Sequence, residues 1–281
     1  RKRDLKRLQS VRDHLPARAL CGVTIFNLGF WGAGGGQSAL SSWLQRLNGR
    51  RLCEARVIGV CVRTIAISNQ KGGVGKTTTA VNLAACLAVA EKKTLLIDMD
   101  PQANATSGCG FQDPKHIELA NIYHALLGQK GLAEVTRSTN LPDLSLVPSH
   151  IHLAGAEVEL VPVIAREYKL NELLKQAGES YDYVIVDCPP SLGLLTVNAL
   201  TAADSVLIPI QCEYYALEGL GKLLHTVRQI QRHLNETLQI AGILLTMADR
   251  RLKLSRQVAA EVKSYFGDKV YKTHINRNVR L

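Results

Sequence analysis

The sequence predicts an α/β fold in which helices cover both faces of a mostly parallel β-sheet. Short apolar runs that are typical of buried strands alternate with segments whose apolar residues recur at helical spacing. A glycine-rich loop or acidic residues follow three of these strands, as expected where parallel strands end at a ligand-binding edge. We expect strands at 64–69, 94–100, 144–147, 181–187, 205–210, 238–247 and 270–275, and helices at 78–90, 216–234 and 255–266.

The first expected strand leads into a phosphate-binding type of loop. A P-loop has the pattern G-x-x-x-x-G-K-[ST], and Gly75 to Thr77 closes that pattern here. Gln70 stands in place of the opening glycine, and Lys71 with two glycines follows, which gives the deviant pattern K-G-G-x-G-K-T-T. Because the loop lies between a strand and a helix, it predicts a nucleotide site in a three-layer P-loop fold. The alternative, a glycine-rich turn without a ligand, fits that context poorly.

Each residue type in the loop suits a triphosphate. Glycines let backbone N–H groups converge on phosphate oxygens, and the helix N-terminus adds partial positive charge. Lys76 is expected to bind the β- and γ-phosphates, and the Thr77 hydroxyl to bind Mg²⁺. Lys71 is a second cation, which can act on a triphosphate from another direction. The expected nucleotide-binding residues of the loop are Lys71, Gly72, Gly73, Val74, Gly75, Lys76, Thr77 and Thr78.

Three aspartates end two other strands at the same expected edge of the sheet. Asp98 and Asp100 end one apolar run, and Asp187 ends another. An acid in that position can hold Mg²⁺, directly or through water, or orient the water that attacks the γ-phosphate. Alternatively, each acid caps the helix or loop that follows it. The sequence favours a role in the site for Asp100 and Asp187 and leaves both interpretations open for Asp98.

Taken together, these motifs resemble the ParA/Soj chromosome- and plasmid-partitioning ATPases, within the wider MinD/ParA group of deviant Walker ATPases. The resemblance covers about residues 63 to 281 and includes several motifs in order, which makes it highly specific. The motifs are Asn69–Thr78, Asp98–Gly108, Leu153–Glu157, Asp187–Ser191, Gln211–Gly219 and Asn278–Leu281.

The resemblance implies an ATPase that works as an ATP-bound homodimer. In such a dimer Lys71 crosses to the partner's phosphates, so that Lys71, Lys76 and Asp100 are the expected catalytic residues. Asp100 is expected to orient the attacking water, and Asp187 to lie near Mg²⁺ together with Thr77. The family further implies that the dimer binds double-stranded DNA without sequence preference, and that a ParB/Spo0J-like partner stimulates hydrolysis.

The distribution of charge agrees with DNA binding near the end of the chain. The formal net charge is +10, but residues 1–63 hold 12 Lys/Arg and 3 Asp/Glu and account for most of it. From residue 249 to residue 281 there are 9 Lys/Arg against 3 Asp/Glu, which is a basic cluster suited to a phosphate backbone. An ordinary solvated helix face is the alternative. Arg251 and Arg280 match the positions at which the family contacts DNA.

The two ends are expected to differ from the ATPase domain, which we assign to 63–281. Residues 1–62 are basic and then glycine-rich and apolar; neither a signal sequence nor a helix-turn-helix fits well, and we expect a disordered or non-native leader. The family continues beyond the final Asn-Val-Arg-Leu motif, so the chain is expected to be truncated. Asn276 and Asn278 are expected near the base, although Asn276 replaces a proline that is usual in the family.

Three other functions remain as alternatives. A MinD-like ATPase that cycles on membranes would need an amphipathic C-terminal helix, and the motifs Glu213–Gly219 and Pro101–Gln102 favour partitioning instead. A redox protein with a bridging iron–sulfur cluster would have to use Cys109 and Cys188, but the seven cysteines contain no C-x-x-C pair. A nucleotide-binding fragment without turnover is the third. The cysteine pattern and the family predict a cytoplasmic, nucleoid-associated protein without stable membrane attachment.

Overall fold

The computed structural model describes residues 62–178, 180–213, 216–249 and 251–277. Within these ranges eight strands form one sheet in the order β3-β4-β2-β5-β1-β6-β7-β8. Every neighbouring pair is parallel except β3 with β4. The strands are β1 Arg63–Ile67, β2 Thr94–Asp98, β3 Arg137–Ser138, β4 Leu144–Val147, β5 Tyr183–Asp187, β6 Ser205–Gln211, β7 Gln239–Ala248 and β8 Val270–Asn276.

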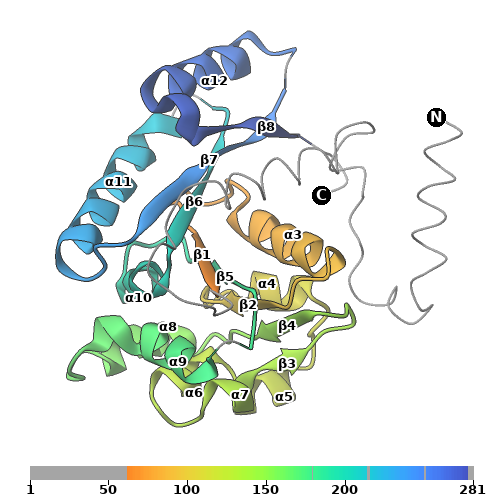
Figure 1. Ribbon diagram of the computed structural model, residues 1–281, viewed down its shortest axis with the longest axis vertical. Coiled ribbons are helices and arrows are strands. Elements are labelled where there is room, and N and C mark those ends of the chain that lie inside the picture. The colour runs from red at the N-terminus through yellow and green to blue at the C-terminus, as the bar shows by residue number, and fades with distance from the viewer. Residues whose placement is uncertain (1–61, 179, 214–215, 250, 278–281) are drawn as a thin grey trace, which may run out of the picture.

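Helices lie on both sides of this sheet, which confirms the predicted fold class (Figure 1). On one side are α3 Lys76–Val89 and α4 Asn104–Gly108. The other side is covered by α6 Ile122–Leu126, α8 Leu153–Glu159, α9 Lys169–Ala177, α10 Leu194–Ala202, α11 Ala216–His233 and α12 Lys253–Phe266. The remaining short helices are α5 Pro114–Leu119, α7 Leu132–Val135, η3 Arg166–Tyr168 and η4 Gly267–Lys269.

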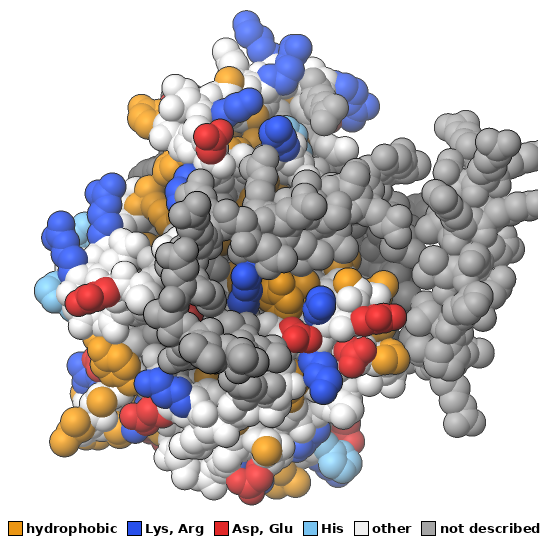
Figure 2. Space-filling view, in the orientation of Figure 1, with side chains coloured by type: hydrophobic (Ala, Val, Ile, Leu, Met, Phe, Trp, Pro, Cys, Tyr) orange, Lys and Arg blue, Asp and Glu red, His pale blue; other side chains and the backbone are white. Residues whose placement is uncertain are grey.

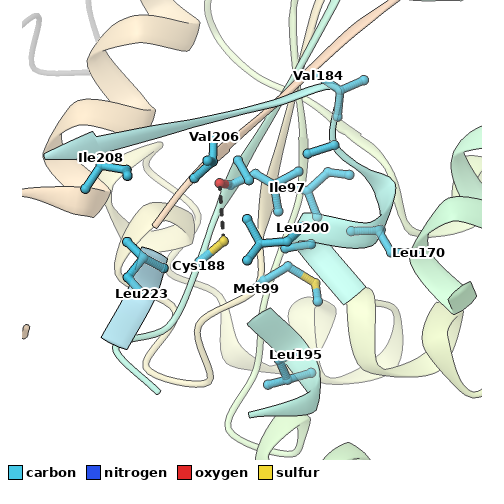
Figure 3. Close-up of a cluster of buried hydrophobic side chains, with 14 of the residues drawn as sticks. Ile97, Met99, Leu170, Val184, Cys188, Leu195, Leu200, Val206, Ile208 and Leu223 are labelled. Carbon is cyan, nitrogen blue, oxygen red and sulfur yellow. Dashed lines mark hydrogen bonds between the residues drawn. The ribbon is translucent and has the colours of Figure 1, made fainter. Parts of the chain in front are cut away.

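The strands are apolar on both faces because helices cover both. In β5, Val184 and Val186 belong to the core on the α10 and α11 side, while Tyr183 and Ile185 belong to the core on the α3 side. This alternation follows from the two-residue repeat of a strand. Figure 3 shows the first of these cores, in which side chains from α9, α10 and α11 meet those of β2, β5 and β6.

The order of the strands reverses at β1. The chain runs from β1 to strands on one side, through β2, β4 and β5, and later to β6 and β7 on the other side. Ligands of open α/β sheets bind at the carboxyl ends of the strands at such a reversal. The P-loop follows β1 directly, so the fold positions it at this switch point. None of the helices in the described ranges is long and apolar enough to cross a bilayer.

Candidate nucleotide-binding site

The backbone of the P-loop takes a shape that requires glycine at two positions. Gly73 has φ 71° and Gly75 has φ 85°, both in the left-handed region that other residues rarely adopt. Gly75 directly precedes α3, whose first residue is Lys76, so the helix begins two residues earlier than the sequence indicated. The unbonded N–H groups of the first turn therefore face the loop, where they favour an anion.

Hydrogen bonds to two distant strands hold the loop in place. Asn69 is buried; its Nδ2 donates to the Pro209 carbonyl at 2.7 Å, and its Oδ1 accepts from the Lys71 N–H at 3.0 Å. Thr246, near the end of β7, donates its hydroxyl to the Val74 carbonyl at 2.8 Å. The loop is thus anchored to β6 at its start and to β7 at its middle.

Lys76 lies inside the loop with its side chain buried. Its Nζ donates to the carbonyl oxygen of Lys71 at 3.2 Å. Burial lowers the pKa of Lys76, and the nearby carboxylates of Asp187 and Asp100 oppose that effect. A buried ammonium that faces two acids and a backbone carbonyl is ready to bind another anion, such as a phosphate.

The side-chain ammonium of Lys71 lies outside the loop. Its Nζ lies 3.3 Å from Oε2 of Glu213, which follows β6, and the two side chains are 33% and 49% exposed. The backbone of Lys71 belongs to the loop, because its carbonyl accepts from Lys76. Its side chain, in contrast, pairs with an acid outside the loop. The two lysines of the motif therefore have separate surroundings.

Asp187 is the buried acid at the centre of the site. It is the register partner of Asp98 in the neighbouring strand, so two carboxylates lie side by side at the ends of β5 and β2. Both are fully buried, and neither carboxylate oxygen of Asp187 has a hydrogen-bond partner among the described residues. Burial first, and the charge of Asp98 second, raise the pKa of Asp187 well above its usual value. The Thr77 hydroxyl, which lies nearby without the geometry of a full hydrogen bond, and the charge of Lys76 lower it.

These surroundings fit a magnesium ion. Two orphaned carboxylate oxygens in a buried position are costly unless a cation or proton joins them. Mg²⁺ prefers oxygen ligands and usually takes one or two carboxylates together with waters and substrate phosphates. Asp187 and the adjacent Thr77 hydroxyl supply such oxygens beside the P-loop. The donor set present in the chain is therefore the one that a nucleotide-bound magnesium needs.

The carboxylate of Asp98, in contrast, already accepts hydrogen bonds from neighbouring residues of the chain. Its Oδ2 accepts from the N–H and hydroxyl of Thr106 at 2.8 and 2.7 Å, and its Oδ1 accepts from the Asp100 N–H at 3.1 Å. Burial raises the pKa of Asp98 to about 6, although these hydrogen bonds lower it. Of the two interpretations that the sequence left open, these contacts favour the cap: Asp98 ends β2 and orders the segment that carries Asp100.

Asp100 is held near the surface of the same edge. It is 7% exposed, and its Oδ1 accepts from the Gln102 N–H at 2.9 Å. Its charge raises the pKa of both Lys76 and Asp187, so the three groups lie near one another. Its expected task of orienting water stays a prediction.

The basic residues near the end of the chain gather on one end of the molecule. Figure 2 shows Lys and Arg side chains over α12 and β8, at the end farthest from α5 and α7. Arg251 is 88% exposed in its side chain and makes two guanidinium contacts with Asp249, of 3.0 and 2.9 Å. Asn276 is exposed at the C-terminal end of β8. Asn278 and Arg280 lie outside the described residues, as does the leader up to residue 61.

The two cysteines considered for a cluster lie in different cores. Cys109 is buried in the core on the α3 side, and Cys188 is buried in the core on the α10 and α11 side. The Cys188 thiol contacts the Val186 carbonyl at 3.9 Å (Figure 3). Burial raises the pKa of Cys109 to about 12, which keeps it a thiol. Both are therefore best described as small core residues.

Three contacts of the site were not predicted. Thr106 binds Asp98, Thr246 binds the loop, and Glu213 pairs with Lys71. Glu213 follows a strand that ends at the ligand-binding edge, which is the same signal that identified the aspartates. A threonine near the end of a strand carries no such signal, because its hydroxyl is satisfied in many ways.

The strand, the glycine-rich loop, the buried lysine and the orphaned acid define a P-loop nucleotide-binding protein. Comparison with known proteins narrows this class. A family described as an AAA domain matches residues 62–240. The sporulation initiation inhibitor protein Soj of Bacillus subtilis (strain 168) is 58% identical over 219 residues, which are 78% of this chain and 86% of that protein.

A second relative, the chromosome partitioning protein ParA of Myxococcus xanthus (strain DK1622), is 55% identical over 219 residues, 78% of this chain and 77% of that protein. A crystal structure of cobyrinic acid a,c-diamide synthase from Mycobacterium smegmatis, with bound ADP and magnesium, has a TM-score of 0.70. The two sequences are 39% identical, and the match covers 74% of this chain and 83% of the synthase chain. Identity is higher to Soj and ParA, and the chain belongs to the ParA/Soj family of partitioning ATPases.

Proposed function

We propose that this chain is an ATP-dependent DNA-segregation ATPase whose active form is a homodimer. The P-loop binds ATP, with Lys76 on the β- and γ-phosphates. Thr77 and Asp187 would hold Mg²⁺, which would supply positive charge beside the phosphates. The orphaned oxygens of buried Asp187 support this assignment, because a cation would satisfy them.

Hydrolysis of ATP needs a water in line with the γ-phosphate and stabilisation of the charge that develops there. Asp100 is the acid proposed to orient that water, because its charge influences both Lys76 and Asp187. Lys76 and Lys71 are the cations proposed to stabilise the transferring phosphoryl group. The reaction gives ADP and inorganic phosphate.

The position of Lys71 is the observation that carries the dimer proposal. Its backbone carbonyl accepts from Lys76 inside the loop, while its ammonium pairs with Glu213 on the outer side. Lys76 already occupies the interior, so the chain's own phosphates do not need a second lysine. A partly exposed cation beside the loop is instead available to a second copy of the chain once its internal ion pair opens. We infer that Lys71 of each chain completes the partner's site.

The basic end of the molecule supports binding of double-stranded DNA without sequence preference. Arg251, Lys253, Arg256, Lys263, Lys269 and Lys272 belong to this end. Lysines and arginines that neutralise phosphates give affinity that depends on salt and not on base sequence. Release is proposed to follow hydrolysis stimulated by a ParB/Spo0J-like partner, in a cytoplasmic protein that associates with the nucleoid.

The direct experiment is an ATPase assay with the full chain, Mg²⁺, double-stranded DNA and a ParB/Spo0J-like protein, alone and combined. We expect weak turnover with ATP alone and a marked rise when DNA and the partner are both present. No turnover in any combination would reduce the protein to a nucleotide-binding chain. Retention on anionic liposomes without salt-sensitive retention on DNA would instead indicate membrane cycling.

A further inference from the structure

Glu213 is the only acid that the structure brings into contact with the Lys71 ammonium within the described residues. The oxygen that accepts is Oε2, at 3.3 Å from Nζ. The other oxygen, Oε1, accepts from Nε2 of Gln211. Both carboxylate oxygens are thus engaged, and the carboxylate is oriented toward the lysine by a neighbour at the end of β6.

The backbone on each side of this pair is also fixed. Asn69 joins the start of the loop to Pro209 in β6, and it accepts from the Lys71 N–H. The Glu213 N–H donates to the Gln211 carbonyl at 2.8 Å. Loop and strand end are therefore tied together directly behind the ion pair. The ion pair therefore forms within one chain and is supported by the surrounding backbone, although its two residues are 142 positions apart in sequence.

We propose that Glu213 is a positioning residue that keeps Lys71 paired within its own chain until ATP-dependent dimerisation. This inference rests on the proposed crossing of Lys71 to the partner's phosphates. An ammonium that contacts a triphosphate in the partner cannot also contact Glu213 at the end of its own β6. The internal ion pair is therefore exchanged for an intermolecular contact, and the nucleotide triphosphate supplies the stronger anion.

The size of the effect follows from the exposure of the pair. Partly exposed ion pairs contribute little individually, so Glu213 delays dimerisation without preventing it. A symmetric dimer breaks two such pairs, one in each chain. Removing the charge at residue 213 should therefore lower the nucleotide concentration needed for half-maximal dimerisation by about 3- to 30-fold.

The test is a titration of the full chain with the non-hydrolysable analogue AMP-PNP and Mg²⁺, followed by sedimentation or light scattering. Glu213→Gln keeps the shape of the side chain and should dimerise at a lower AMP-PNP concentration than the wild type. Glu213→Asp keeps the charge and should remain closer to the wild type. Glu236→Gln, an exposed acid between α11 and β7, is the matched control and should have no effect.

The outcomes separate this inference from the proposed function. If the wild type forms no dimer at any AMP-PNP concentration, the dimer proposal fails. If the wild type dimerises but Glu213→Gln has an equal or higher midpoint, the dimer stands and the role of Glu213 is wrong. A misfolded variant would aggregate without AMP-PNP, so a lowered midpoint counts only for a variant that is monomeric before the nucleotide is added.

Discussion

The side-chain ammonium of Lys76 donates to the backbone carbonyl oxygen of Lys71, with 3.2 Å between the two atoms. One contact therefore joins the two lysines of the motif and gives them different roles. Lys76 is held inside the loop next to Asp187, while the side chain of Lys71 is left outside and pairs with Glu213. When phosphate enters, Lys76 can exchange a neutral carbonyl for an anion without leaving its place.

Asp187→Asn should stabilise the nucleotide-free protein and weaken its response to magnesium. The substitution removes a buried charge whose oxygens lack hydrogen-bond partners, so we expect the free energy of unfolding to rise by about 1–3 kcal/mol. It also removes the carboxylate proposed to hold Mg²⁺, so ATP affinity in Mg²⁺ should fall by at least about 10-fold. Denaturant unfolding and calorimetric titration with and without EDTA measure both effects.

Asp204→Asn provides the control for that experiment. Asp204 precedes β6 at the opposite edge of the sheet and accepts from the Thr64 N–H at 2.8 Å. Asparagine keeps an oxygen that can accept from the Thr64 N–H, so the fold should be retained, and the response of ATP binding to EDTA should match the wild type. A variant at Asp187 that keeps the wild-type response to magnesium would remove Asp187 from the metal site.

Asp98→Asn should change how stability depends on pH. The pKa of Asp98 is raised to about 6 by burial, so the folded state binds a proton more tightly than the unfolded state. This contribution is fully present below about pH 4 and is lost as pH rises through 6. We therefore subtract the unfolding free energy of the variant from that of the wild type. This difference should decrease by about 2–3 kcal/mol from pH 4 to pH 7. Urea unfolding across this range measures it, and a difference that grows with pH would contradict the assignment.

Asp100→Ala should separate nucleotide binding from hydrolysis. The Asp100 side chain accepts one hydrogen bond, from the Gln102 N–H, so the fold should tolerate its removal. We expect ATP-dependent dimers that bind DNA, with turnover reduced by at least about 100-fold. Steady-state phosphate release and DNA retention on the same preparation test this. Release from DNA on addition of ATP, or turnover near the wild-type rate, would rule out the proposed role.

Arg251→Ala should weaken DNA binding and flatten its dependence on salt. Each lost phosphate contact reduces the slope of log K against log salt by about one, so a dimer should lose about two. The effect should be the same for DNA of different sequences. Lys115→Ala is the control, because this exposed lysine belongs to α5 at the opposite end of the molecule (Figure 1). An unchanged slope for Arg251→Ala would remove this residue from the DNA-binding surface.

The parts of the fold that the sequence predicted are those with a strong local pattern. The strand at 144–147 was predicted with its observed bounds, and the long helices α11 and α12 within two residues at each end. Strand β3 has only two residues, too few for a two-residue repeat to be visible. The strand expected to reach residue 100 ends at Asp98, because that side chain accepts the Asp100 N–H and turns the chain.

For the site, the sequence indicated the residues but not their pairings. The loop and its acids follow from local spacing, and the structure brings Lys76, Asp100 and Asp187 together. The contacts of Thr246 with Val74 and of Lys71 with Glu213 join residues more than 140 positions apart. Such contacts depend on the order of the strands in the sheet, which one sequence does not specify. Asp98 was ambiguous for a similar reason, since its main partner is Thr106 on a helix that was not predicted.

The central claim is that the active site is completed across two chains by Lys71. Binding of AMP-PNP and Mg²⁺ to Lys71→Ala, measured together with its molecular mass by light scattering, tests this claim most directly, with Lys76→Ala as a control that should lose the nucleotide. We predict that Lys71→Ala binds the nucleotide within a few-fold of the wild type but remains a monomer and has no stimulated turnover. A Lys71→Ala protein that dimerises and hydrolyses ATP like the wild type would contradict the account.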